Sequence, residues 1–264
     1  MNRLDSMPFT LSHPAAIVPI QRYWKGASLS ALVIGSMAPD FVYFLRIAIS
    51  GALSHSLAGI ITFCVPASLV AYLIFHLLIK RPFWLLLPDR LRSRLDIESP
   101  DWLPTSPKSW AVISASAALG AATHVAWDSF THANTAVVTY FSWLRSAIGP
   151  DSGPRIPLYK LLQHSSTVLG LWILAAALRR WFNATPPLHI PGNQLSPKMR
   201  MAVVLVLLIA GSLGLLIGAM SVPGAALERM TFRGIVKGVQ WFAIAALLYC
   251  ILMQTYLGIR RDAG

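Results

Sequence analysis

The stretch MAVVLVLLIAGSLGLLIGAMSV, residues 201–222, carries no charged side chain and decides the fold class. As an α-helix it would be about 33 Å long at 1.5 Å per residue, enough to cross the roughly 30 Å hydrocarbon core of a bilayer. A second uncharged stretch, GVQWFAIAALLYCILMQTYL at 238–257, meets the same criterion. The chain is therefore predicted to be an integral membrane protein.

Further apolar runs toward the N-terminus extend this pattern. Those at 161–178, 110–127 and 57–79 are long enough to span a bilayer, and none shows the sustained two-residue alternation of a strand. The run 26–45 is also apolar, but a Pro-Asp pair at 39–40 interrupts it. We predict an all-α fold, a polytopic transmembrane helical bundle with about six membrane segments, one or two of them broken or partial.

The composition agrees with a chain that is solvated mostly by lipid. Of the 264 residues, 55% are hydrophobic and only 12% are charged, whereas soluble domains are about 25% charged. This excludes a disordered chain, a fibrous repeat and an ordinary cytosolic enzyme. The formal net charge is +12, from 22 Lys and Arg against 10 Asp and Glu. We attribute this excess to cytoplasmic loops and expect membrane lipid, not nucleic acid, as the partner.

The cysteines and the N-terminus imply no covalent processing. Cys64 and Cys250 lie inside apolar runs, which indicates buried thiols and no disulfide framework. The first residues lack the apolar core of a signal peptide. Both Met1 and Met7 are candidate start residues.

A Pro-rich linker is predicted at 183–197, where the sequence contains four prolines. It divides a helical membrane domain with many polar residues, 1–182, from a C-terminal pair of transmembrane helices, 198–264.

Basic pairs predict the orientation of the chain. Those at 80–81, 179–180 and 260–261 close alternate spans and therefore fall on one face. Because cytoplasmic loops are rich in Lys and Arg, we expect this face to be cytoplasmic in a multi-pass protein of the cell inner (plasma) membrane.

Seven ionisable residues near the span ends do not fit an inert anchor. Alternation of the spans places His55, the pair His124 and Asp128, and His164 on the face opposite the basic pairs, which is the non-cytoplasmic face. A short N-terminal hairpin would bring His13 and Asp40 to the same face. Placing such an ionisable side chain at membrane depth costs roughly several kcal/mol. A functional role is therefore the default interpretation for these residues. The candidate metal ligands are His13, Asp40, His55, His124, Asp128, His132 and His164.

The pair His124 and Asp128 carries the most specific signal. Residues four apart project from the same side of a helix, so one imidazole and one carboxylate could chelate one divalent ion. Such ligands suit zinc, with manganese or iron as alternatives, and one or two ions are expected. An incompletely coordinated Asp40 or Asp128 could serve as a catalytic general base. The alternative is a structural polar network between helices.

Five blocks of sequence carry a resemblance to a known family. The chain resembles a domain-of-unknown-function family of bacterial polytopic membrane proteins. The blocks are MPFTLSHPAA (7–16), IGSMAPDF (34–41), SHSLAG (54–59), THVAWDSFTHAN (123–134) and LQHSSTVLG (162–170).

The chain is more distantly similar to membrane-bound metal-dependent hydrolases and to zinc-dependent phospholipase C. That similarity implies a first metal held by Asp40, His55, His124 and Asp128. It also implies that Asp128 bridges to a second metal, bound by one or more of the three remaining ligands His13, His132 and His164. The phospholipase pattern has Glu four residues after its last His, where this chain has Val168.

Two functions from different classes follow. The first is a metal-dependent hydrolase that cleaves a phosphoester, with an anionic or phosphorylated lipid head group as the expected substrate at the membrane surface. The second is a non-enzymatic membrane protein, either a scaffold or a metal or proton carrier. A transporter is expected to repeat its hydrophobic halves, and no repeat is present here.

Overall fold

The computed structural model describes residues 10–45, 49–97, 104–150, 153, 155–189 and 195–262. Met1 and Met7 lie outside these ranges. Within them, five helices are long and apolar enough to cross a membrane. Their bounds are Leu57–Leu86, Pro107–Tyr140, Leu158–Ala184, Pro197–Met220 and Arg229–Ile259. Leu29–Leu45 forms a shorter apolar helical segment, so the predicted class of an all-α membrane protein with a partial sixth segment is confirmed.

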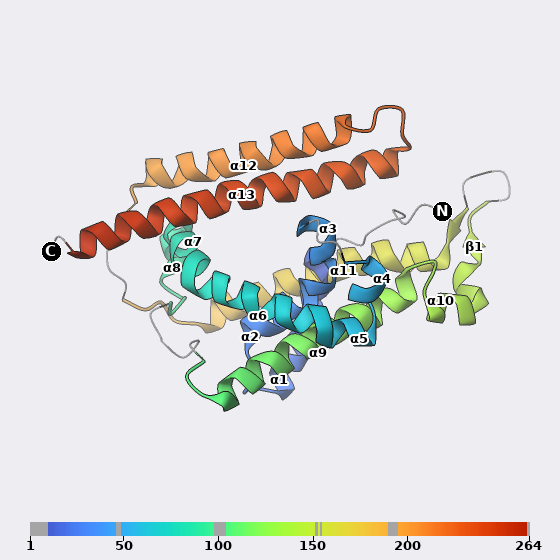
Figure 1. Cartoon of the computed structure of the whole chain (residues 1–264), viewed down its shortest axis with the longest axis horizontal. Coiled ribbons are helices and arrows are strands. Elements are labelled where there is room, and N and C mark those ends of the chain that lie inside the picture. The colour runs from blue at the N-terminus through green and yellow to red at the C-terminus, as the bar shows by residue number, and fades with distance from the viewer. Residues whose placement is uncertain are drawn as a thin grey trace.

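The elements follow one another along the chain as Figure 1 shows. The first half contains η1 (Thr10–Ala16), α1 (Ile17–Tyr23), α2 (Leu29–Met37), η2 (Ala38–Asp40), α3 (Phe41–Leu45), α4 (Gly51–Ser54), α5 (Leu57–Gly59), η3 (Ile60–Cys64), α6 (Val65–Ile74), η4 (Phe75–Ile79), α7 (Lys80–Leu86) and α8 (Asp89–Arg92). The second half contains α9 (Pro107–Thr131), α10 (Ala136–Tyr140), η6 (Ser142–Arg145), β1 (Ala147–Ile148), β2 (Ile156–Pro157), α11 (Leu158–Ala184), α12 (Pro197–Met220) and α13 (Leu227–Asp262). The two short strands pair antiparallel.

The predicted break near Pro39 is present and positions an acidic residue. Helix α2 ends at Met37, and Pro39 lies in the 3₁₀ turn η2 before the chain continues as α3. Proline cannot donate the backbone hydrogen bond that an α-helix interior requires, so the helix stops there. Asp40 occupies this turn and is 1% exposed.

Helices α2 and α9 pack closely because glycines lie at their contact. A Cβ atom added at Gly35 would overlap the backbone of Ala117, and one added at Gly120 would overlap the carbonyl oxygen of Leu32. Small residues allow helix backbones to approach in this way inside membranes. The separation of these two helices is therefore set by the absence of side chains at two positions.

Replacing Gly120 by alanine should lower the thermal unfolding midpoint of the detergent-purified protein. The added methyl group would force α9 away from α2, and overpacking of this kind costs about 1–3 kcal/mol. Gly258→Ala is the matched control, because nothing lies within 4 Å of the position its Cβ would take. Equal midpoints for the two variants would contradict the close approach of α2 and α9.

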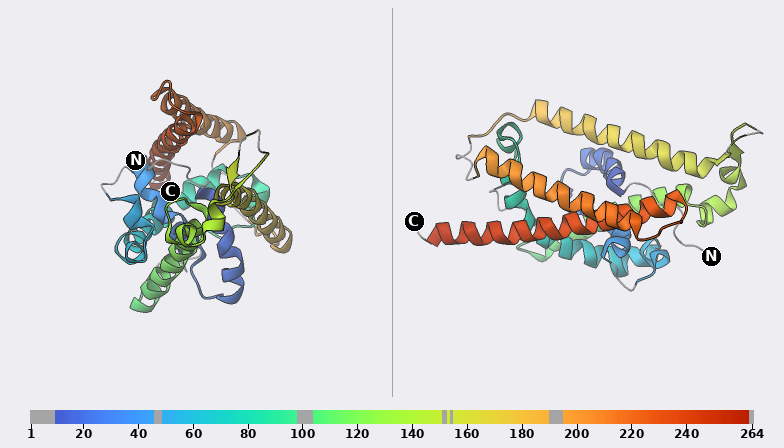
Figure 2. Two further views of the ribbon diagram at one scale, coloured as in Figure 1. Left: turned by 90° about the vertical axis from the view of Figure 1, so that its right-hand side faces the viewer. Right: turned by 90° about the horizontal axis from the view of Figure 1, so that it is seen from above.

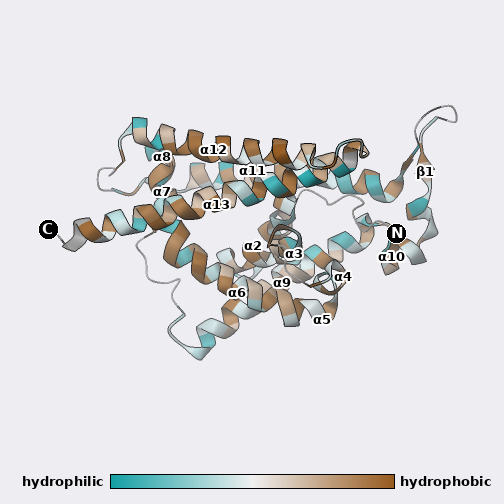
Figure 3. Cartoon of the chain, turned by 45° about the horizontal axis from the view of Figure 1, so that its top comes forward, coloured by the Kyte–Doolittle hydropathy of each residue, from teal (hydrophilic) through white to brown (hydrophobic). Residues whose placement is uncertain are grey.

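The C-terminal helices α12 and α13 lie side by side along one flank of the other helices (Figures 1 and 2). Gly214 and Gly218 of α12 lie against the backbones of Lys237 and Arg233 in α13. Hydrophobic residues run along most of α12 in Figure 3, and many, including Leu208, are exposed. Exposed apolar helices of this length are expected for a surface that faces lipid.

Polar side chains of α13 attach this pair to the earlier helices. Gln240 donates to the Phe44 carbonyl at 2.7 Å, and the Tyr249 hydroxyl donates to the Pro82 carbonyl at 2.9 Å. Gln254 donates to the Leu77 carbonyl, which belongs to the π-helical turn η4. These contacts do not test the predicted division of the chain at 183–197, which stays a prediction.

Candidate metal centre

Five of the seven predicted ligands come together from separate elements. His13 lies in η1, Asp40 in η2, His55 after α4, and His124 and Asp128 in α9. Asp40, His124 and Asp128 are each buried. The structure thus brings residues that are more than one hundred positions apart in the sequence into one cluster.

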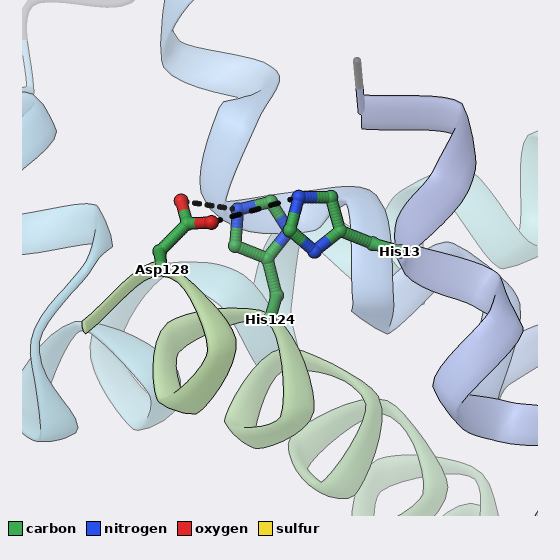
Figure 4. Close-up of side chains that lie close together, drawn as sticks. All are labelled: His13, His124 and Asp128. Carbon is green, nitrogen blue, oxygen red and sulfur yellow. Dashed lines mark ion pairs between the residues drawn. The ribbon is translucent and has the colours of Figure 1, made fainter. Parts of the chain in front are cut away.

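The first group contains three of these residues and is drawn in Figure 4. On α9, His124 Nε2 lies 3.2 Å from Asp128 Oδ2. His13 Nε2 lies 3.6 Å from the other carboxylate oxygen, Asp128 Oδ1. The two imidazole rings are stacked, with centroids 3.8 Å apart and planes inclined by 14°. Asp128 therefore presents one oxygen to each of two histidines.

The second group shares His124 and adds Asp40 and His55. Asp40 Oδ1 lies 3.3 Å from His55 Nε2 and 3.7 Å from His124 Nε2. His55 Nε2 also lies 3.5 Å from Asp128 Oδ2. One carboxylate oxygen and two imidazole nitrogens of this group thus lie within 4.8 Å of one another.

These separations suit ligands around a metal ion better than hydrogen-bonded partners. Charge-assisted hydrogen bonds between nitrogen and oxygen are about 2.7–2.9 Å long. Ligand atoms about 2.0–2.1 Å from a tetrahedral zinc ion are about 3.3 Å apart. The five distances of 3.2–3.7 Å between these side chains lie close to the second value.

Backbone carbonyls fix the direction of two of the imidazoles. His124 Nδ1 lies 2.7 Å from the Ser36 carbonyl oxygen, and His55 Nδ1 lies 3.0 Å from that of Gly51. Because a carbonyl can only accept, Nδ1 carries a proton in both rings and Nε2 is the atom that faces the cluster. Metal-binding histidines typically have this arrangement.

Thr10 supports the cluster and was missed by the sequence interpretation. Its hydroxyl donates to Asp40 Oδ2 at 2.6 Å, which leaves Asp40 Oδ1 to face the imidazoles. The available signal was its place in the block MPFTLSHPAA, three residues before His13. A threonine alone carries no ligand pattern, so spacing could not identify it.

The cluster holds polar atoms whose hydrogen-bonding capacity is unused. Among the described residues, His13 Nε2, His124 Nε2 and Asp128 Oδ1 are buried and lack a hydrogen-bond partner. Burial of such groups is costly unless they are paired or coordinate a metal. Asp40 and Asp128 together place two carboxylates here, and a cation would compensate both.

The two cluster histidines outside the spanning helices differ in protonation. Burial and the neighbouring His124 lower the pKa of His13 to about 4, so His13 is neutral at pH 7 and offers a lone pair. For His55, burial acts against the charged form, but Asp128 and Asp40 outweigh it and raise the pKa to about 10. His55 therefore holds a positive charge between the two carboxylates, and a metal ion would take the place of its Nε2 proton.

The remaining two predicted ligands lie differently. His132 ends α9, and its Nδ1 lies 3.1 Å from the Asp128 carbonyl oxygen and 3.7 Å from Asp128 Oδ2. His164 is exposed on α11 and lies outside both groups, whereas its neighbour Gln163 is buried. Of the predicted set, the structure brings five together, leaves His132 at the edge and places His164 apart.

The fold and the cluster define a polytopic α-helical membrane protein with a buried His/Asp group that could hold a metal ion. The family model described as Domain of unknown function (DUF4184) matches residues 7–251, and the chain belongs to this family. The expected membership of a domain-of-unknown-function family is thereby confirmed. No curated protein and no solved structure matches the chain.

Proposed function

We propose that this protein is an integral membrane hydrolase that uses zinc to cleave a phosphoester in a lipid head group. One observation carries the proposal: two groups of His and Asp side chains that share His124 each bring three ligand atoms within 4.8 Å of one another, which is close enough to hold an ion. Asp128 Oδ1, which faces His13, provides for a second ion.

Each group has a separate role in the proposed hydrolysis. A zinc ion, when bound, would lower the pKa of a water molecule and polarise a phosphoryl oxygen. With one ion bound, Asp128 is the proposed general base, because its Oδ1 is then uncoordinated, is buried and accepts no hydrogen bond. It takes a proton from water as the water oxygen bonds to phosphorus. The bond from phosphorus to the alcohol oxygen breaks, and the proton ends on that alcohol. Thr10 holds Asp40 in place throughout.

Removal of metal should abolish hydrolysis. Purified wild-type protein should release a phosphorylated head group or phosphate from mixed lipid vesicles. Treatment with a chelator should lower the rate at least about a hundredfold, since water has a pKa of about 15.7 without an ion. Added zinc should restore the rate. Absence of activity on all lipids and phosphoesters tried would favour the non-enzymatic alternative, a scaffold or carrier with a structural network.

The proposed orientation places the cluster on the non-cytoplasmic side. In Figure 1, α7, α8 and the C-terminus lie at one end of the molecule, and β1 and α10 lie at the other. The basic pairs at 80–81 and 179–180 belong to the first end, and His124 and Asp128 lie in the part of α9 nearest the second. The excess of Lys and Arg favours the cytoplasm for the first end.

Cysteine labelling tests this orientation. In a variant with Ser146→Cys, an impermeant thiol reagent should label whole cells, because Ser146 is exposed beside β1. The native Cys64 and Cys250 are buried and should give little background. Ser93→Cys, beside α8, is the matched control and should react only after lysis. The reverse pattern would place the cluster in the cytoplasm.

A further inference from the structure

A large apolar cavity adjoins the cluster. It has a volume of about 1170 Å³ and lies between α11, α13 and the helices α2, α3, α6 and α7. In Figure 2, α11 and the α12–α13 pair run along different sides of the molecule. The walls are formed mainly by apolar side chains such as Phe44, Ile74, Phe83, Val239 and Phe242. Water gains few hydrogen bonds in such a space, so a hydrocarbon is the suitable occupant.

Most polar side chains of the cavity come from η1 and α11, and Thr231 of α13 also lines it. Lys160, His164 and Thr167 follow one another at helical spacing on one face of α11. Thr10 also lines the cavity and donates to Asp40 Oδ2. Phe41, directly after Asp40, forms part of the same wall. One residue, Thr10, therefore contacts both the cavity and the proposed metal centre.

The cavity is long enough to take a lipid chain. Its lining residues on α13 extend from Leu227 to Leu247, which is about 30 Å of helix at 1.5 Å per residue. One leaflet of a bilayer is about half of the roughly 30 Å hydrocarbon core. An extended acyl chain of a membrane lipid therefore fits along α13, with its polar end beside α11.

We propose that this cavity binds the acyl chain of an anionic phospholipid, with its phosphate held by Lys160, His164 and Thr167 at the end that adjoins the cluster. The positive charge of Lys160 complements the phosphate, and the side chains of His164 and Thr167 can hydrogen-bond to it. His164 thus acts in head-group recognition and not in metal binding. The proposal rests on the proposed hydrolase only in that the held phosphate faces the reacting centre.

Photo-crosslinking tests the acyl-chain half of the proposal without relying on hydrolysis. The probe is a phosphatidylglycerol with a diazirine in one acyl chain, in nanodiscs that contain the full-length protein. Peptide mapping should find adducts on α13 at cavity residues such as Val239. Ala243→Trp, which fills the cavity, should lower this labelling at least about fivefold. Ile244→Trp is the control, because Ile244 is exposed on the same helix outside the cavity and should leave labelling unchanged.

Separate variants test the proposed phosphate contacts. Lys160→Gln should lower labelling about fivefold, the effect of about 1 kcal/mol for one basic residue near an anionic lipid, and His164→Ala should act in the same direction. Arg155→Gln is the control, since Arg155 is exposed nearby but does not line the cavity. A diazirine fatty alcohol without phosphate should label wild type and Lys160→Gln equally.

The outcomes separate this proposal from the hydrolase. Loss of labelling in Ala243→Trp with unchanged metal content would support a lipid site, whether or not any hydrolysis is found. Labelling spread evenly around α13 would overturn the acyl-chain site. Equal labelling of wild type, Lys160→Gln and His164→Ala by the phospholipid would overturn the phosphate contacts. Loss of bound metal in His164→Ala would return this residue to the ligand set.

Discussion

Replacement of His124 by alanine should remove nearly all transition metal from the purified protein. His124 belongs to both ligand groups, so its loss weakens every arrangement in which the cluster could hold an ion. Wild-type protein should retain at least about half an equivalent of metal, chiefly zinc. Loss of a residue that only orients a ligand typically costs 10–100-fold in metal affinity, so loss of the ligand itself should cost at least about as much. Elemental analysis of detergent-purified protein measures this directly.

His76→Ala is the matched control for that measurement. His76 is partly buried like His55, but its ring is hydrogen-bonded with Ser30 and it lies in η4, away from the cluster. Its removal should leave the metal content unchanged. A chelator should also lower the unfolding midpoint of wild type, because an ion at about 100 times its dissociation constant stabilises the folded state by about 2.7 kcal/mol. Wild-type protein without metal, and with the same midpoint in chelator, would contradict the metal centre.

The fold class could be predicted because a bilayer imposes its own length on a helix. Residues 201–222 and 238–257 are uncharged over a full span, and both coincide with spanning helices of the structure apart from two residues at one end. The break at Pro39 was predictable for a local reason, since proline lacks a backbone donor. The contact of Gly35 and Gly120 was not, because it depends on which helix faces which.

The cluster could be predicted in part because its members lie near the same ends of alternating spans. His124 and Asp128 needed only helical spacing, and His55 followed from the order of the spans. His13 and Asp40 followed from the predicted N-terminal hairpin. The rotation of α11 about its axis could not be read from the sequence. Adjacent helical residues point about 100° apart, and it is Gln163, not His164, that the structure buries.

The orienting groups could not be predicted at all. The carbonyls of Ser36 and Gly51 belong to the backbone and leave no trace in residue identity. They accept from His124 and His55 because α2 ends at Met37 and α4 ends at Ser54, which places these carbonyls beside the rings. The hydrogen bond that the Thr10 hydroxyl donates to Asp40 likewise requires that η1 lies next to η2. Tertiary packing therefore decides which nitrogen of His124 faces the cluster, whereas the carbonyl beside His55 lies only four residues earlier in the chain.

Replacement of Asp128 by asparagine should lower hydrolysis at least about a hundredfold while expression changes little. The amide keeps the shape of the side chain but loses the charge and one of the two acceptor oxygens. Both oxygens are used here, Oδ1 toward His13 and Oδ2 toward His124. The substitution should weaken metal binding and also remove the proposed general base. The spanning helices themselves supply the energy of insertion, so the amount of protein in the membrane should stay similar.

Asp89→Asn is the matched control for Asp128→Asn, because Asp89 is exposed and pairs with Arg200 and Arg92 at the other end of the molecule. Its effect should be small, since exposed ion pairs contribute about 0–1 kcal/mol. The comparison also separates the two functions. In a purely structural network the new amide group could still bond across helices, and such bonds are worth about 1–2 kcal/mol or less in membranes. Full activity in Asp128→Asn would therefore refute the catalytic role of this carboxylate, because a base and ligand cannot be lost without effect on the rate.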